Sequence, residues 1–462
     1  MSIFSSLRAE SRATIALAVP IMAGQVSQMA MGLVDSAMVG RVGVLPLAAS
    51  AFANNLISGP FVFGVGLLTC LSVRASQSHG AGDRRESGEF LRHGLVLALV
   101  AGLLATLSVW ILSFHLHRFG QDAAVARESR SFLLLLGLSI VPAILSMGLK
   151  GWCEALGSPW PPTLLLFLAV PLNVFLNWVL IYGNLGFEAQ GLEGAGWATL
   201  WSRVAALGAM VIYVARSPQM RPSLPLHWAR KLERPRFISL LQIGVPAALQ
   251  IVLEVGAFAL GAIWVGWLGK EALAAHQIAL SCASTTFMLP LGLAMATTIR
   301  IGTAIGGGDL GRVRAIGFTS LALSLLVMAT TATIFAVFGR SIAGAFVDDP
   351  QVAIIAAQLL TIAAIFQLFD GLQVVGAGAL RGLSDATVPM LLCFLAYWLI
   401  GLPAGYFAAF SWKWGAVGIW SGFALALALL SGFLAARFAA KSRPSCLQKD
   451  HVGGASPVLS VH

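Results

Sequence analysis

The chain has 462 residues, of which 58% are hydrophobic and only 10% are charged, and its mean hydropathy is +0.85. Soluble domains carry roughly 25% charged residues, so this composition excludes an ordinary soluble enzyme and indicates a membrane protein. The net charge of +10 does not indicate a nucleic-acid partner, because the basic residues lie in short loops between apolar segments and form no single patch.

Twelve apolar segments approach or exceed the length of about 20 residues that a helix needs to cross the hydrocarbon core of a bilayer. The alternation of apolar and polar residues that marks outer-membrane strands is missing. The sequence therefore predicts an all-α polytopic membrane protein. In chain order, the expected transmembrane helices are 13–39, 46–73, 90–113, 128–152, 160–183, 192–215, 237–265, 272–301, 314–339, 352–376, 387–410 and 416–438.

The basic residues indicate how the helices are oriented. Twelve spans place both termini on one side, and the segments on that side hold 21 of the 29 Lys and Arg residues, against seven on the other side and Arg203 inside a span. Because basic loops stay on the cytoplasmic side, we expect a multi-pass protein of a bacterial-type inner (plasma) membrane, with cytoplasmic N- and C-termini.

The two halves of the chain resemble each other. At an offset of 226 residues, Gly, Pro and charged positions coincide over about 65 residues, which indicates an internal duplication. The matching pairs include Val19-Pro20 with Val245-Pro246, Gly40 with Gly266, Phe61 with Phe287, Arg74 with Arg300, and Gly82-Asp83 with Gly308-Asp309.

The longest polar connection, residues 216–236, separates the two copies. We predict an N-terminal six-helix lobe over 1–215, a cytoplasmic basic linker over 216–236, a C-terminal six-helix lobe over 237–438 and a cytoplasmic tail over 439–462. Each copy has six spans, so both enter the membrane from the same side and form a parallel repeat. Such repeats are typical of alternating-access transporters, with the substrate site between the halves; the alternative is a duplicated scaffold without transport.

Three carboxylates lie inside apolar spans, namely Asp35, Glu254 and Asp370. A charged group in hydrocarbon is costly, and it usually faces a partner, a cavity or an ion path. Burial and a second nearby acid both favour the protonated form of a carboxyl group, so such groups can load and release a proton or share a cation. No basic residue is expected deep in the spans of Glu254 and Asp370 to neutralise them.

Uncharged polar side chains accompany these acids. Asn173, Asn177 and Thr199 add oxygen donors in the half that holds Asp35, where they could hold a small cation or tune the proton affinity of the acid. Hydrogen bonding between helices explains them equally well. In the other half, glutamines lie within one turn of Glu254 and Asp370, and the eighth span adds a polar row that begins at Gln277.

Three other polar groups are interpreted without a role in transport. Arg203 is expected to snorkel toward the cytoplasm, although it could instead pair with an acid. His276 is expected on the surface near the outer mouth. Glu154 is explained by an i, i+4 pair with Lys150 at the cytoplasmic end of a helix.

Three segments carry a resemblance to a known family: VPIMAGQVSQMAMGLVDSAMVGRVG in the first span, VPAALQIVLEVGAFALGAIWVGWLG in the seventh and FQLFDGLQVVGAGALRGLSDATVPM in the tenth. With these segments the chain resembles the multidrug and toxic compound extrusion (MATE) family, NorM branch. The resemblance implies two six-helix lobes around a V-shaped central cavity. It also implies secondary active export of organic cations and amphipathic drugs, exchanged for sodium ions or protons by rocker-switch alternating access.

The resemblance also implies two ion sites. Asp35, Asn173, Asn177 and Thr199 match the cation or proton site of the N-lobe. Glu254 and Asp370 match that of the C-lobe, to which Gln277 and Gln367 are added. Na⁺ could bind at Asp35 or at Glu254 and Asp370. The expected substrate-cavity residues are Gln25, Gln28, Met31, Gln250 and Ser281.

The sequence slightly favours the proton over the sodium ion as the coupling ion. Phe366 occupies a position where some NorM-like sodium sites have a tyrosine, and the chain has only four Tyr. No cofactor is expected besides the coupling ion, because the cysteines lack metal-site spacing and no GK[ST] nucleotide motif occurs. The expected partners are small organic cations and the lipid bilayer, for a monomeric protein that is not an enzyme.

Other classes require features that this sequence does not have. A lipid-linked oligosaccharide flippase should place several basic residues deep in its spans to hold phosphates, whereas the deep spans here are acidic apart from Arg203. An intramembrane aspartyl protease should carry a motif like GxGD, but Asp370 follows Phe369. A channel needs a symmetric ring of filter residues, which two unequal halves do not supply.

Overall fold

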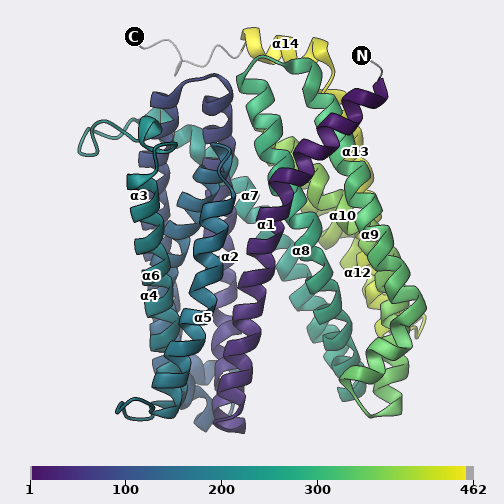
Figure 1. Ribbon diagram of the computed structural model, residues 1–462. Helices are drawn as coiled ribbons and strands as arrows, with labels where there is room; N and C mark the ends of the chain where they lie inside the picture. Colours follow the sequence, from purple (N-terminus) through teal and green to yellow (C-terminus); the bar gives the residue numbers. More distant parts are fainter. Residues whose placement is uncertain (1–2, 454–462) are drawn as a thin grey trace. The chain divides into compact units, whose positions relative to one another are not determined.

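The computed structural model describes residues 3–453, which form helices and connecting turns and contain no strand. Twelve of the helices in this range are long and apolar enough to cross a membrane (Figure 1). The predicted all-α polytopic architecture with twelve spans is confirmed. The predicted tail is 439–462, and its residues from 454 onward lie outside the described part of the chain.

The first six spans agree with the predicted ones, and all of them except α5 extend beyond the predicted bounds. Helix α2 has 37 residues and is therefore about 55 Å long at 1.5 Å per residue, more than the roughly 30 Å hydrocarbon core. Hydropathy marks only the part of a helix inside the core, so the polar ends were not predicted. The helices are α1 (Ile3–Gly40), α2 (Val44–Gly80), α3 (Arg84–Ser113), α4 (Ala123–Ala155), α5 (Trp160–Tyr182) and α6 (Gly191–Arg216).

The second half repeats this order with one irregular span. The predicted span 387–410 consists of α11 (Thr387–Phe394), α12 (Leu402–Tyr406) and two π-helical segments, Leu395–Gly401 and Phe407–Ser411. Pro403 has no N–H to donate, which favours such a break in the hydrogen-bond ladder. The regular helices are α7 (Arg234–Trp267), α8 (Lys270–Gly306), α9 (Leu310–Phe346), α10 (Pro350–Gly382), α13 (Ala416–Lys441) and α14 (Pro444–Gly453).

The chain forms two compact units. The N-terminal unit is Ala23–Ala248, and the C-terminal unit combines the described residues up to Met22 with those from Leu249 onward. Helices α1 and α7 thus each contribute residues to both units. Inside the N-terminal unit, α4 packs against α2, α3 and α6; inside the C-terminal unit, α10 packs against α8, α9 and α13. The lobe boundaries drawn from the sequence stay a prediction.

The repeated Gly-Asp turns have the same backbone geometry in both halves. Gly82 and Gly308 each have a φ of +73°, a left-handed conformation that glycine adopts without steric cost. The next residue then begins a helix: Asp83 accepts a hydrogen bond from the backbone N–H of Glu86 at 2.8 Å and caps α3. The internal duplication is therefore visible in the backbone as well as in the sequence.

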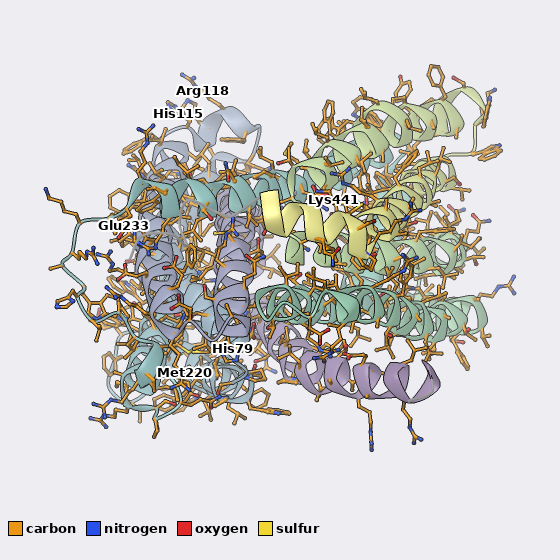
Figure 2. The ribbon with its side chains drawn as sticks, turned by 90° about the horizontal axis from the view of Figure 1, so that it is seen from above. His79, His115, Arg118, Met220, Glu233 and Lys441 are labelled. Atoms are coloured by element: carbon orange, nitrogen blue, oxygen red, sulfur yellow. The ribbon has the colours of Figure 1, made fainter. Side chains whose placement is uncertain are left out.

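The linker between the halves packs against α3. Arg92 is almost completely buried, pairs with Glu89 at 2.7 Å, and donates to the backbone carbonyl of Lys231 at 3.4 Å. Nε2 of His93 accepts a hydrogen bond from the backbone N–H of Glu233 at 2.8 Å. Figure 2 labels Glu233 and also Met220, which is fully buried at the start of the linker. The beginning of α7 is thus held in the N-terminal unit.

Candidate functional site

The carboxylate of Asp35 on α1 lies against polar residues of α5 and α6. Nδ2 of Asn177 donates to Oδ1 of Asp35 at 2.5 Å and to Oδ1 of Asn173 at 3.1 Å. Asn173 and Thr199 lie next to the same carboxylate. The structure therefore brings together all four residues predicted for the first ion site, inside one compact unit.

Local helix geometry explains this cluster. Asn173 and Asn177 are four residues apart, so they share one face of α5, and both are completely buried. The hydroxyl of Thr199 donates to the carbonyl of Ala195 at 3.0 Å, which leaves its oxygen lone pairs available. Oδ1 of Asn177 is buried and has no hydrogen-bond partner in the described part of the chain. Such an orphaned acceptor is costly unless a ligand or water satisfies it.

Arg203 joins this site, so the prediction that it snorkels toward the cytoplasm is wrong. It lies one turn after Thr199 on α6 and donates to Oγ of Ser139 at 2.8 Å. Its guanidinium carbon is 5.4 Å from the ring centroid of Phe61 and interacts electrostatically with Asp35. Together these partners stabilise the partly buried charge of Arg203. The first site thus contains one carboxylate and one guanidinium group.

The second site is formed by Glu254 on α7 and Asp370 on α10. The two carboxyl groups lie within electrostatic reach of each other, and Gln373 donates a hydrogen bond to Glu254. Arg381, two turns further along α10, also interacts with Glu254. Arg381 forms no ion pair with either acid in the described part of the chain, and the expectation that no basic residue neutralises them stays a prediction.

Tyr397 is the residue of this site that the sequence did not indicate. It lies in the π-helical segment, is completely buried, and is within electrostatic reach of both Glu254 and Asp370. Its hydroxyl has no hydrogen-bond partner among the described residues. The scarcity of tyrosine was one reason to lean toward protons, and that reason no longer holds. The available signal was a tyrosine in an otherwise apolar span, which also contains Tyr406.

Phe366, by contrast, belongs to an aromatic cluster. Its ring centroid is 6.0 Å from that of Phe258 and 5.7 Å from that of Trp420. Phe258 in turn lies 5.9 Å from Tyr397. The side chain at position 366 therefore packs in the core beside the acid site, while the phenol comes from another helix.

The two added residues of the second site differ in their surroundings. Gln367 is completely buried, and its Oε1 accepts a hydrogen bond from Thr331 at 2.8 Å, while its Nε2 has no partner within the described range. Gln277 is exposed on α8, and its backbone carbonyl accepts a bond from Ser281 at 2.8 Å. Gln367 thus has the buried, incompletely satisfied amide expected of a site residue, whereas Gln277 has no such feature.

The residues predicted for the substrate cavity lie on three helices. Gln25, Gln28 and Met31 are partly exposed on α1, Gln250 is buried in α7, and Ser281 is partly exposed on α8. Gln25, Gln28 and Met31 follow one another at helical spacing, so they share one face. Their contact with substrate stays a prediction.

Two further interpretations are tested by burial. His276 is completely buried and accepts a hydrogen bond from Nε1 of Trp420 at 3.0 Å, so its assignment to the surface is wrong. The i, i+4 pair of Lys150 and Glu154 is confirmed, at 2.6 Å. Both side chains are buried, however, because α4 is covered by its neighbours along this stretch.

The donor atoms decide what these sites can hold. No group of three or more His, Cys, Asp or Glu side chains that could hold a metal ion occurs among residues 3–453. The clusters instead offer carboxylate, amide and hydroxyl oxygens, which suit a hard monovalent cation or a proton. Each cluster lies within one compact unit and has one partly buried guanidinium group within electrostatic reach.

Comparisons with known proteins agree with this architecture. The MatE family model matches residues 20–179 and 246–407, two stretches that begin at the 226-residue offset of the duplication. The chain is 35% identical to a probable multidrug resistance protein NorM of Mesorhizobium japonicum, over 94% of this chain and 95% of that protein. It is 33% identical to the multidrug resistance protein NorM of Aliivibrio fischeri, over 88% and 90%.

Solved structures show the same fold. A mutant of the Vibrio cholerae MATE transporter VcmN superimposes with a TM-score of 0.88 at 20% identity, covering 95% of this chain and 99% of that one. The eukaryotic MATE transporter AtDTX14 superimposes with a TM-score of 0.85 at 21% identity, covering 96% and 100%.

Proposed function

This chain belongs to the MatE family of transporters and is not an enzyme, and we propose that it is a secondary active multidrug exporter. Its substrates are organic cations and amphipathic drugs, which it exchanges for an inward-moving cation by rocker-switch alternating access. It acts in the plasma membrane, as a monomer with both termini in the cytoplasm. The names of its relatives support drug efflux, and the basic loops support this orientation.

The cluster around Asp35 carries this proposal. A carboxylate that accepts hydrogen bonds from buried amides can change its charge without unfolding its surroundings, because the amide oxygens and Thr199 offer alternative bonds. Exchange requires a group that binds the coupling cation on one side of the membrane and releases it on the other. Glu254 and Asp370 form a second group of this kind in the other unit.

We propose that the coupling ion is the proton. A sodium ion needs several oxygen ligands around it, whereas a proton needs only one. At Asp35, Oδ1 already accepts an N–H from Asn177, which leaves fewer carboxylate lone pairs for a metal ion. This observation favours a proton at Asp35, and we extend the assignment to the second site.

Transport in vesicles tests the proposal. Purified protein in liposomes should move ethidium, a fluorescent organic cation, against its gradient when a proton gradient is imposed. A sodium gradient alone should have a much smaller effect. Absence of gradient-driven flux with ethidium and several other such dyes would contradict export. Flux that follows only the sodium gradient would contradict proton coupling but not efflux.

Arg203→Gln should make Asp35 bind a proton more tightly, because it removes a positive charge that opposes loading. A unit charge about 4 Å away contributes about 1 kcal/mol even in a medium as polar as water, which corresponds to roughly a fivefold change in ion binding. The proton concentration that gives half-maximal ethidium flux should therefore fall by about fivefold. Arg203→Lys keeps the charge and is the matched control. An unchanged proton dependence in the Gln variant would show that Arg203 does not act on the ion site.

A further inference from the structure

The beginning of α1 is fastened to α8 and α9 by one buried carboxylate. Nε of Arg312 donates to Oε1 of Glu10 at 2.8 Å, and Arg300 forms a second ion pair with the same carboxylate. Arg300 also donates to the backbone carbonyl of Glu10 at 2.8 Å and to the hydroxyl of Thr14. Glu10 and Thr14 are both buried. We call Glu10, Arg300 and Arg312 the α1 clamp; it lies within the C-terminal unit.

The beginning of α7 is fastened to α3 in a similar way. Arg236 makes a bidentate pair with Glu86, with Nε donating to Oε1 at 3.0 Å and Nη2 to Oε2 at 2.6 Å. Arg74 on α2 interacts electrostatically with Glu86. Glu233, labelled in Figure 2 where the linker leads into α7, pairs with Arg236 from the other side. We call Arg236, Glu86 and Arg74 the α7 clamp; it lies within the N-terminal unit.

The two clamps occupy the same three positions of the duplicated sequence. At the offset of 226 residues, Glu10 aligns with Arg236, Glu86 with Arg312, and Arg74 with Arg300. Each clamp therefore contains one carboxylate and two guanidinium groups, but the acid is on the first helix in one clamp and on the third helix in the other. The same ion-paired contact thus occurs twice, with the acidic and the basic residue exchanged between the first and third helices.

The reversal determines which helices can pair. Within the first half, the aligned residues of the first and third helices are Glu10 and Glu86, which repel each other. Within the second half they are Arg236 and Arg312, which also repel. Between first and third helices, attraction is therefore available only across the two halves, and these are the pairs observed.

We propose that the α1 and α7 clamps are paired latches that hold the two helix beginnings on the opposite half and open during each transport cycle. This inference rests on the proposed transport function. Helix α1 has its first turns in the C-terminal unit and the rest in the N-terminal unit, and α7 has the converse arrangement. A change of access that moves one unit must bend these helices or release their beginnings, and the ion pairs are the contacts that resist release.

Reversible cross-linking tests whether the latches open. The variants Glu10→Cys/Arg312→Cys and Glu86→Cys/Arg236→Cys would be made with Cys282 and Cys446 replaced by Ser, because these two cysteines are not buried. Linking either pair with a cleavable bifunctional thiol reagent should reduce proton-driven ethidium flux at least tenfold. Cleaving the link should restore the flux to that of the same variant before linking.

A pair that lies within one half is the matched control. Oδ2 of Asp385 and Nε of Arg437 are 2.7 Å apart in the C-terminal unit, beside Lys441, which Figure 2 labels. Linking Asp385→Cys to Arg437→Cys with the same reagent should leave the flux unchanged. Full flux through protein whose α1 or α7 clamp is linked would overturn the proposal.

A second measurement does not depend on flux. Thr14→Cys, made with the same replacements of Cys282 and Cys446 by Ser, places a thiol beneath the α1 clamp while leaving Glu10 and Arg312 in place. Its labelling by a water-soluble maleimide should become at least threefold faster when ethidium and a proton gradient are added. Labelling that stays the same in all conditions overturns the latch. If labelling changes but wild-type protein shows no flux with any dye, the latch stands and the proposed drug export fails.

Discussion

Replacing Asp35 by asparagine is expected to reduce gradient-driven ethidium efflux at least tenfold while leaving the protein folded. The amide has the same shape as the carboxyl group, so Asn177 and Thr199 keep a neighbour of the same size. It cannot bind or release a proton, however, and it offers no charge to a cation. Flux in liposomes and resistance of cells that express the variant both measure the effect.

The matched control makes the same chemical change outside the site. Asp122 caps α4, with Oδ1 accepting a hydrogen bond from the backbone N–H of Ala124 at 2.7 Å. Asparagine caps helices about as well as aspartate, so Asp122→Asn should transport like wild type. If Asp35→Asn transports normally at equal expression, Asp35 is not the group that couples.

Enlarging Gly422 is expected to have the largest effect on folding. A Cβ atom built at this position of α13 would lie 2.5 Å from the carbonyl oxygen of Gly401 and 2.6 Å from Cα of Gly405. Both contacts are to backbone, so relief requires a shift of the π-helical segment that carries Tyr397. Overpacking of this kind typically costs about 1–3 kcal/mol or more. Gly422→Ala should lower the unfolding temperature clearly, and Gly422→Leu should prevent folding.

Gly432, on the same helix, is the control. No atom lies within 4 Å of a Cβ built there, and Ala exceeds Gly in helix propensity by about 1 kcal/mol. Gly432→Ala should therefore unfold at the wild-type temperature or slightly above it. Thermal unfolding in detergent, followed by size-exclusion chromatography, compares the two. Equal unfolding temperatures for both variants would contradict the close packing of α13 on Gly401 and Gly405.

The duplication repeats the scaffold but not the chemistry of the ion sites. Asp35 aligns with Gly261, Glu254 with Gln28 and, after one residue of slip, Asp370 with Ala143. The guanidinium groups follow no repeat either, because Arg203 and Arg381 occupy different positions of their halves. The two compact units therefore present acid sites of different composition, and the corresponding variants should differ in their effect on coupling.

Much of the architecture follows from local properties of the sequence. A helix in lipid satisfies its backbone hydrogen bonds internally, so the apolar run alone predicts a span. The cost of burying charge singles out Asp35, Glu254 and Asp370 in the same way. The i, i+4 spacing of Asn173 and Asn177 places both on one face, and the structure turns that face toward Asp35.

Contacts between distant segments depend on packing and were therefore missed or misread. Tyr397, in a π-helical segment, lies within electrostatic reach of both acids, and Arg203 donates to Ser139 on α4. The partners of Glu10 and Arg236 lie in the opposite half of the sequence, where no local pattern indicates them. Hydropathy and periodicity thus determined the spans and the buried acids, whereas only the tertiary structure decided which charges neutralise each other, because pairing depends on distance in space.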